Sequence, residues 1–485
     1  MKFKKFAAIG IAALMAAGVL AGCSSTVDET QQPAGELPHV YIPENDVVFQ
    51  ETWMDLDGRV ITMLCIRAGR GDNRWDYDWD DAERTPNETL RVMEILRQIE
   101  REYNTTIEIE WIAAGNVMPT LTQNRTAGDA PFDLFETGLT EFGVQSLYTG
   151  RHVMPVTHPE IVDIIKPHDN PWLEASAFSI VGDTQFAVHF KPLNSPDILR
   201  STLMFNDTLR QQLNLPNFYD MVRSGTWTWD EFDSILNQAH QQSDGTFFPI
   251  IHGHEGLIIP LFIYSNNGTL AENTPYGLQF VGHTNDNALE AMNFVLSFAQ
   301  RGFFHPSSGQ RDAPLGLAAS QGEALFIFNW YDTMKNLTRN IPGHDGPYTF
   351  GILPTPIGPR YDRFMMTVYT EVLYHVMADI HAPAEAAAVL VAIANRTRVP
   401  DAFRIQHELN YSLQSDCSAE MMAIMLENVK IDRSRIHGEA RRGGGDALVA
   451  ANNRVLAGSQ TPVQAMQGIA NSMQSWFDAL NVLDE

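Results

Sequence analysis

A nearly continuous apolar run, Val60 to Ile66, opens the part of the chain with a clear folding pattern. Strands that are buried on both faces of a parallel sheet have such continuous apolar runs, whereas in half-exposed strands apolar and polar residues alternate. A helical pattern follows, and then two more strand-like runs, Thr106 to Trp111 and Phe132 to Glu136. The apolar stripe of the helix consists of Leu90, Met93, Leu96 and Ile99. This strand–helix–strand order predicts a parallel α/β sheet.

The ends of these strands are candidate ligand positions, because open α/β sheets bind ligands beyond the carboxyl ends of their strands. We therefore expect the loop 67–81 and Glu136 at one rim. Within this loop, aromatic and acidic residues alternate: Trp75, Asp76, Tyr77, Asp78, Trp79 and Asp80. Aromatic rings stack on the C–H face of a sugar, and carboxylates accept hydrogen bonds from its hydroxyls. A sugar-binding rim and a purely structural loop both fit this pattern.

The first residues have the pattern of an export signal. A basic start with three lysines precedes the apolar run Phe6 to Leu20, which is too short for a permanent membrane span. The sequence Leu20-Ala21-Gly22-Cys23 resembles the lipobox of bacterial lipoproteins, which implies cleavage of residues 1–22 and lipidation of Cys23. An ordinary secretory signal is the alternative. Residues 23–45 are polar and read as a flexible tether.

Charge and cysteine content restrict the class of protein. Removal of three lysines with the signal changes the formal net charge from −26 to −29. Such an acidic chain is poorly suited to nucleic acid or anionic lipid as a partner. Cys65 and Cys417 remain, which is not a disulfide framework in so long a chain, and whether they are bonded to each other stays open. The length is sufficient for two lobes with separate cores.

Two runs in the second half carry a family resemblance. Gly322 to Trp330 begins as a turn and becomes an apolar strand, and Phe350 to Pro359 is a strand that prolines interrupt after Leu353. Together they resemble the motifs of the bacterial carbohydrate-binding lipoproteins of ABC importers, the maltose-binding-protein-like family 1 of extracellular solute-binding proteins. Leu325 stands where that family usually has Met. The run Thr226 to Phe232, Thr-Trp-Thr-Trp-Asp-Glu-Phe, is similar to another signature of the family.

The resemblance implies a class II periplasmic-binding-protein-like fold, with two α/β lobes joined by hinge crossings. The first lobe would comprise residues 46–195 and 368–408, and the second 196–367 and 409–485. Val181 to Phe190 resembles the last strand of the first lobe, and Ser201 to Asn206 the first strand of the second. Trp227, Trp229 and Phe232 are expected to pack around a helix start that Thr228 caps.

The same resemblance implies a sugar site in the cleft between the lobes. Trp330 matches the family's cleft tryptophan, and the turn 252–256 faces the cleft from the second lobe. The alternative for Trp330 is a core role, and for the turn a plain connection. The residues that we predict to contact ligand are Trp75, Asp76, Trp79, Glu136, His254, Glu255 and Trp330.

Metal sites are the least favoured interpretation of both stretches. The Asp-x-Asp-x-Asp spacing from Asp76 suggests calcium, but Asp81 occupies the position of the turn glycine of an EF-hand loop. His252, His254 and Glu255 lack the helical His-Glu-x-x-His spacing of a zinc site. We therefore predict no metal, no other cofactor and no catalytic residue.

The resemblance implies a receptor rather than an enzyme. The expected protein is a monomeric, lipid-anchored receptor on the extracellular face of the cell membrane, which captures a carbohydrate and delivers it to an ABC permease. A secreted glycoside hydrolase is the main alternative, and it would need two carboxyl groups at a defined separation, one with a raised pKa. A surface adhesin or peptide-binding module would fit the lipobox but not the family-like runs.

Overall fold

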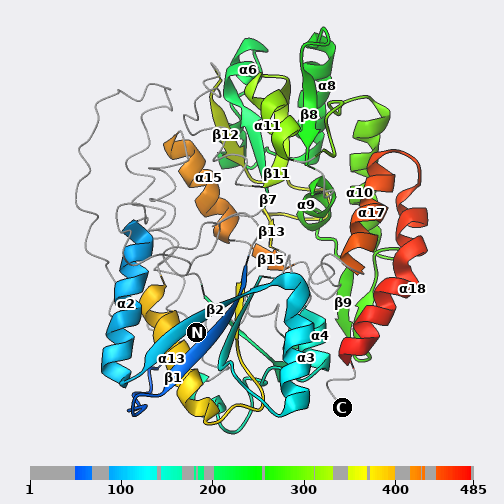
Figure 1. Cartoon of the computed structure of the whole chain (residues 1–485). Coiled ribbons are helices and arrows are strands. Elements are labelled where there is room, and N and C mark those ends of the chain that lie inside the picture. Colours follow the sequence, from blue (N-terminus) through cyan, green and yellow to red (C-terminus); the bar gives the residue numbers. More distant parts are fainter. Residues whose placement is uncertain are drawn as a thin grey trace, which may run out of the picture.

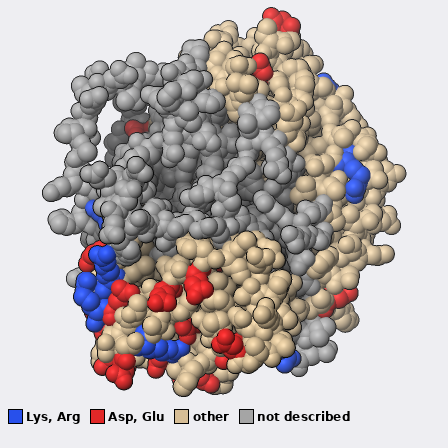
Figure 2. All heavy atoms as spheres, in the orientation of Figure 1, with Lys and Arg blue, Asp and Glu red and all other residues tan. Residues whose placement is uncertain are grey.

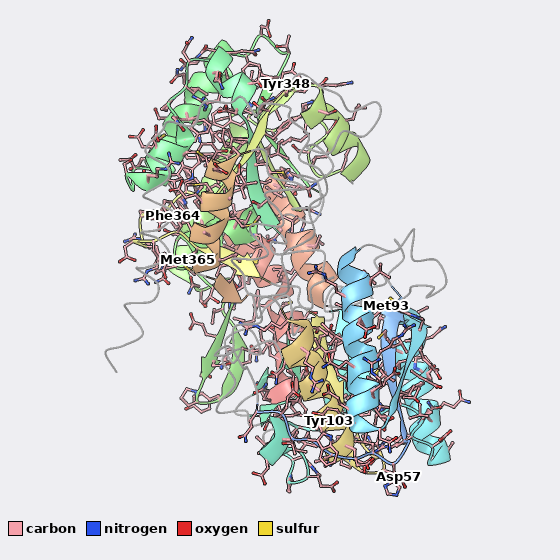
Figure 3. All side chains as sticks on the ribbon, turned by 90° about the vertical axis from the view of Figure 1, so that its left-hand side faces the viewer. Asp57, Met93, Tyr103, Tyr348, Phe364 and Met365 are labelled. Atoms are coloured by element: carbon pink, nitrogen blue, oxygen red, sulfur yellow. The ribbon has the colours of Figure 1, made fainter. Side chains whose placement is uncertain are left out.

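The structure is a computed structural model, and it describes thirteen segments of the chain (Figure 1). These are residues 50–67, 87–138, 144–165, 180–181, 184–190, 201–253, 257–310, 312–330, 348–368, 372–398, 415–427, 429–431 and 444–481. Two main sheets organise them, and we call the part around each sheet a lobe. Figure 3, turned by 90°, shows the two lobes one above the other.

The first lobe is built on a five-stranded sheet with the strand order β2-β1-β3-β14-β6. Its bounds are β2 Thr106–Ala113, β1 Val60–Arg67, β3 Leu134–Gly138, β14 Val372–Val376 and β6 Val188–His189. β1 is parallel to β2 and to β3, which confirms the parallel α/β order that the sequence predicts. β14 is antiparallel to both of its neighbours, β3 and β6.

Helices cover this sheet on both faces. In Figure 1, α2 (Asn87–Tyr103) and α13 (Pro383–Thr397) lie on one side of it, and α3 (Val117–Ala127) and α4 (Val144–Thr149) on the other. In the predicted stripe of α2, Met93, Leu96 and Ile99 are buried and Leu90 is half-buried. Burial of this stripe explains why the sequence between β1 and β2 carries helical periodicity.

The second lobe is built on a four-stranded sheet with the order β12-β7-β11-β8. Its bounds are β12 Phe350–Leu353, β7 Ser201–Asn206, β11 Ala324–Trp330 and β8 Phe248–His252. β11 is parallel to β8, and β7 runs antiparallel to both β11 and β12. The strands predicted from the two family-like runs are thus neighbours of the same strand, β7.

Gly322 begins the first of these runs for a steric reason. Its φ is +78°, and a Cβ at this position would lie 2.3 Å from the ring of Tyr348, which precedes β12 (Figure 3). Only glycine adopts this conformation without strain and tolerates so close a ring. The turn therefore delivers the chain into β11, whose residues 325–328 are completely buried.

The core of the second lobe confirms the structural role of the Trp-Thr-Trp run. Thr228 caps α8 (Trp229–Gln242) by accepting a hydrogen bond from the Glu231 backbone N–H at 3.5 Å. Trp227 is fully buried and its indole donates to the Pro354 carbonyl at 2.9 Å. The Trp229 ring stacks on Phe294 with centroids 4.4 Å apart. These side chains hold the helix start to the sheet.

Further elements complete the described part of the chain. In the first lobe these are η1 Ala114–Asn116, α5 Val162–Ile165, β4 Ile180–Val181 and β5 Thr184–Gln185. The remaining helices are α6 Asp207–Gln212, α7 Phe218–Arg223, α9 Ile258–Ser265, α10 Asp286–Gln300, α11 Asp312–Ser320, α15 Asp416–Glu427, α17 Gly444–Leu456 and α18 Pro462–Asn481. The remaining strands are β9 Ala271–Thr274, β10 Gly277–Phe280, β13 Met366–Val368 and β15 Val429–Ile431.

One expected strand takes a different form. The stretch from Val181 to Phe190 is not a single strand of the first sheet. β4 and β5 pair only with each other, and β6 alone joins the sheet, where its pairing with β14 covers two residue pairs. Residues 185–188 are all buried, but burial here does not come with continuous strand pairing.

The chain returns to the first lobe through β14 and α13, and arginines fix both ends of α13. Arg59 pairs with Asp133 and donates to Glu385 at 2.7 Å and to the Ala382 carbonyl at 3.0 Å. At the other end, Arg396 pairs with Glu51 and Glu102, both at 2.7 Å. Charged groups of both signs also gather on this lobe in Figure 2, whereas the described residues of the second lobe that are visible on the same face include few.

None of the helices in the described segments is long and apolar enough to cross a membrane. The domain limits of the sequence analysis stay predictions. Cys65 lies buried in β1 and is not part of a disulfide, so it is not bonded to Cys417.

The arginine at the start of α13 yields a stability prediction. Replacing Arg59 in Arg59→Met leaves Asp133, whose side chain is only 11% exposed, without its ionic partner. We expect the free energy of unfolding to fall by about 2–3 kcal/mol, the cost typical of losing a hydrogen bond to a charged, partly buried group. Urea unfolding measures it. The control is Arg101→Met, which removes an exposed pair with Glu94 and should cost less than about 0.5 kcal/mol. Equal losses in the two variants would contradict the role of Arg59.

Candidate functional site

The two sheets direct their strand ends toward the middle of the molecule. In Figure 1, β1 and β2 run from the far end of the first lobe toward the second lobe, and β8 ends near the start of α9 at the centre. The carboxyl ends of β1 and β3 therefore lie at one edge of the first sheet, and those of β8 and β11 at one edge of the second. These edges are where the sequence places the ligand.

The predicted contact residues fall on these edges to different extents. Glu136 lies in β3, buried, directly between Cys65 of β1 and Tyr374 of β14. The backbone of Trp330 ends β11, opposite Ser201 of β7, while its side chain lies outside the described residues. Trp75, Asp76, Trp79, His254, Glu255 and the lipidation residue Cys23 also lie outside them. The structure therefore places one predicted residue on each sheet.

On the first sheet, a buried polar network lies beside Glu136. The Tyr148 hydroxyl is 3.3 Å from His375 Nε2, and His375 Nδ1 is 3.3 Å from the Phe135 carbonyl. A carbonyl only accepts, so Nδ1 carries the proton and Nε2 accepts from Tyr148. Burial lowers the pKa of His375 to about 3 and raises that of Tyr148, so both side chains are neutral. The network joins α4, β14 and β3 at Phe135, the residue before Glu136.

On the second sheet, His252 ends β8 as a buried, neutral side chain. Its Nδ1 donates to the Gly253 carbonyl at 2.9 Å, and its ring meets Phe304 edge-on with centroids 4.7 Å apart. Burial lowers its pKa to about 4. His252 thus supports the strand end and carries no positive charge for an anionic ligand. Within the described part of the chain, no group of three His, Cys, Asp or Glu side chains could hold a metal.

Sequence reasoning missed the residues that adjoin His252 at this edge. The Gly253 N–H donates to the Phe328 carbonyl of β11 at 2.8 Å, so the ends of β8 and β11 are tied together. A Cβ on Gly253 would lie 2.3 Å from Asn329 Oδ1. Asn329 is fully buried and pairs in register with Thr202 of β7, which is 1% exposed. The only sequence signal was a glycine between two histidines and a polar residue ending an apolar run.

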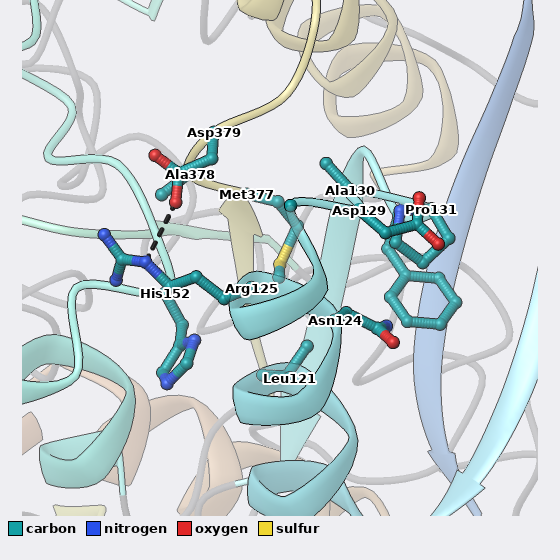
Figure 4. A pocket seen from close by; sticks show the side chains of 12 residues that line it. Leu121, Asn124, Arg125, Asp129, Ala130, Pro131, His152, Met377, Ala378 and Asp379 are labelled. Carbon is teal, nitrogen blue, oxygen red and sulfur yellow. Dashed lines mark ion pairs between the residues drawn. The ribbon is translucent and has the colours of Figure 1, made fainter.

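A separate cavity lies at the opposite edge of the first sheet (Figure 4). Its volume is about 260 Å³, and its lining includes Arg125, His152, Phe132 and Met377. Arg125 Nε pairs with Asp379 at 3.0 Å, and its Nη1 donates to the carbonyls of Gly150 and Arg151. Burial and the Arg125 charge lower the pKa of His152. Phe132 precedes β3 and Met377 follows β14, so this cavity lies away from the strand ends that carry Glu136.

Two α/β lobes whose strand ends converge on the middle of the molecule constitute the fold of the ABC-transporter solute-binding proteins of the maltose-binding type. Among similar solved structures, the sugar-binding protein MalE of Xanthomonas citri is 14% identical, with a TM-score of 0.59 over 87% of this chain and 97% of that chain. An ABC substrate-binding protein of Listeria monocytogenes, in complex with cycloalternan, is 11% identical, with a TM-score of 0.54 over 86% and 99%.

A third similar structure is a sugar transporter protein of Arthrobacter chlorophenolicus with bound laminaribiose. It is 12% identical, with a TM-score of 0.53 over 86% of this chain and 99% of that chain. No protein-family model and no curated protein matches the sequence. The similarity therefore establishes the two-lobed fold.

Because His375 and His252 are buried and neutral, we predict that the folded protein loses stability as the pH falls. An unfolded histidine has a pKa of about 6.5, so below that pH the unfolded chain binds protons that neutral His375 and His252 do not. Their contribution to stability is complete above about pH 6.5 and is lost as the pH falls toward their folded pKa values. We expect wild type to lose about 2 kcal/mol more stability than His375→Gln between pH 7 and pH 5.

Urea unfolding at several pH values in this interval measures the effect. For each variant, the quantity to compare is the change in the free energy of unfolding between pH 7 and pH 5. The carboxyl groups contribute equally to this change in every variant, so their contribution cancels in the comparison. His381→Gln, which removes an exposed histidine, should follow the wild-type pH dependence. If His375→Gln follows it as well, His375 is not buried as a neutral side chain.

Proposed function

We propose that this chain is the substrate-binding lipoprotein of an ABC importer, which captures a carbohydrate between its lobes and delivers it to a membrane permease. The observation that carries the proposal is the fold, which matches over most of its length binding proteins that were solved with cycloalternan or laminaribiose. The strand ends support it, because Glu136 and Trp330 belong to the edges that face the middle of the molecule.

The mechanism follows from the two-lobed arrangement. A sugar that contacts both strand edges gains all its contacts only when the lobes are closed, so its binding shifts the equilibrium toward the closed form. Within each lobe the sheets are tightly buried, so closure is a rigid-body movement at the crossings between them. The permease would recognise the closed form. Trp330 provides a stacking surface for the sugar, and carboxylates such as Glu136 accept hydrogen bonds from its hydroxyls.

Binding without turnover distinguishes this proposal from a glycoside hydrolase. A hydrolase needs a carboxyl group whose pKa is raised so that it stays protonated. Among the described carboxyl groups, four have a clearly shifted pKa: Asp55, Glu102, Asp244 and Glu290. In each of them a hydrogen bond lowers the pKa. They give no support to an acid catalyst.

The functional test combines binding, turnover and the Trp330→Ala variant. A thermal-shift screen of mono- and oligosaccharides should find a sugar that stabilises the wild type, since ligand bound to the native state stabilises it by mass action. Calorimetry should then show one-to-one binding, and the recovered sugar should be intact. Trp330→Ala should lose about 2–4 kcal/mol of binding free energy, as for buried aromatic hot spots, with little change in stability.

Trp53→Ala is the matched control, because Trp53 is 66% exposed on the first lobe and donates to the Glu102 carbonyl, away from the strand ends. It should bind the sugar like wild type. Degradation of the sugar over many turnovers would favour a hydrolase. A Trp330→Ala protein with unchanged affinity and a loss of about 3–5 kcal/mol in stability would assign Trp330 to the core.

We also propose that Cys23 carries the lipid anchor, on the basis of the Leu-Ala-Gly-Cys run after the apolar segment. More than one acyl chain anchors a protein stably, which would keep the receptor beside its permease. Cys23→Ser should appear in the soluble fraction or remain unprocessed, and fractionation with immunoblotting detects either result. Processed Cys23→Ser that stays in the membrane fraction would refute the lipoprotein assignment.

A further inference from the structure

Strands β7 and β11 of the second sheet change from apolar to polar residues at the edge that faces the middle of the molecule. Residues 325–328 of β11 and 203–205 of β7 are apolar and buried, and the next residue of each toward the edge is Asn329 or Thr202. Both are polar and buried, and they stand opposite each other in the register of β7 and β11. A buried amide in a central strand is costly unless its hydrogen bonds are satisfied. Asn329 is also the neighbour in the chain of Trp330, the residue that we predict to stack on the sugar.

The amide of Asn329 occupies space that only a glycine leaves free. A Cβ on Gly253 would lie 2.3 Å from Asn329 Oδ1 and 3.0 Å from Asn329 Cγ, but 3.8 Å from Asn329 Cβ. The first distance is far below any normal contact, and the last is an ordinary one. The close approach therefore depends on the amide group of Asn329 and on the missing side chain of Gly253.

The backbone around Gly253 is held from two sides. Its N–H donates to the Phe328 carbonyl at 2.8 Å, and the preceding carbonyl, of His252, accepts from the Gly309 N–H at 2.9 Å. The His252 ring donates to the Gly253 carbonyl. A group added at Gly253 must therefore be accommodated mainly by movement of Asn329, whose neighbour in the chain is Trp330.

We propose that Gly253 and Asn329 are positioning residues for sugar binding, because their contact fixes the end of β11 and with it Trp330. They form a junction between β8 and β11, and neither residue needs to touch the sugar. This inference rests on the proposed function. Beyond that function, we infer that the affinity for the sugar depends on the contact between Gly253 and Asn329, which lies beneath the binding surface, as well as on the side chains that form this surface.

The test compares four variants with wild type: Gly253→Ala, Asn329→Ala, the double variant Gly253→Ala/Asn329→Ala, and Gly351→Ala. In Gly351→Ala the new Cβ would lie 2.1 Å from the Tyr219 hydroxyl, a similar clash in the same sheet. Gly351 pairs with Phe205, toward the other end of β7 from Ser201 and Trp330. It is therefore the matched control for overpacking at a position unrelated to the ligand.

We expect Gly253→Ala to raise the Kd for the sugar at least tenfold, and Gly351→Ala to change it less than twofold although both lower the Tm. In the Asn329→Ala background, Gly253→Ala should change the Kd less than threefold, because only the 3.8 Å contact with Cβ remains. Equal effects of Gly253→Ala in both backgrounds, or an unchanged Kd in Gly253→Ala, would overturn the proposal.

Hydrogen exchange provides a readout that needs no sugar. Gly253→Ala should speed amide exchange in the peptide that contains Asn329 and Trp330, whereas Gly351→Ala should not. Unchanged exchange in that peptide would refute the junction, whether or not a sugar binds. If the wild type binds no sugar and the exchange still responds as expected, the proposed function fails while the structural junction stands.

Discussion

The pairing of β14 with β3 is the contact on which the architecture depends. β14 lies at residues 372–376 and β3 at 134–138, so the first sheet is completed only by chain that returns from the second lobe. His375 fixes this pairing from within the core, through Tyr148 and the Phe135 carbonyl. Arg59 and Arg396 then hold α13, which follows β14, against the first lobe. Because these contacts join distant segments, they are costly in loop entropy, and several interactions have to act together.

This return also explains how two rigid lobes can move against each other. The chain passes between the sheets before β7 and again before β14, so each lobe contains segments from both halves of the sequence. Each sheet is held together by its own hydrogen bonds, and each lobe is stabilised by its own buried aromatic or ionic contacts. In the closure that we propose, movement would be confined to the crossings between the lobes. In the function that we propose, the sugar would receive contacts from both edges without disturbing either core.

The sequence predicted well those features that depend on local periodicity. The strands at 60–67, 201–206 and 324–330 and the capped helix at Trp229 all follow from burial patterns and a capping residue. The prediction of a single strand from Val181 to Phe190 was wrong, because burial of a segment does not by itself specify which strand it pairs with.

The contact between Gly253 and Asn329 could not be foreseen. Its residues are 76 positions apart, and no local pattern brings them together. Of the predicted site, five residues and the Trp330 side chain lie outside the described segments, so they stay predictions.

Electrostatics restricts the kind of ligand that such a site can use. The chain carries a formal net charge of −26. Among the described side chains, His252 at the end of β8 and His375 in β14 are buried and neutral. An anionic ligand would approach against a repulsive field, whereas an uncharged sugar is neither attracted nor repelled at long range. Its affinity must then come from short-range contacts, the stacking and hydrogen bonds that form when the lobes close. Those contacts are sensitive to displacements of about an ångström. A junction that fixes the end of β11 to the end of β8 is therefore more important for an uncharged ligand than for a charged one.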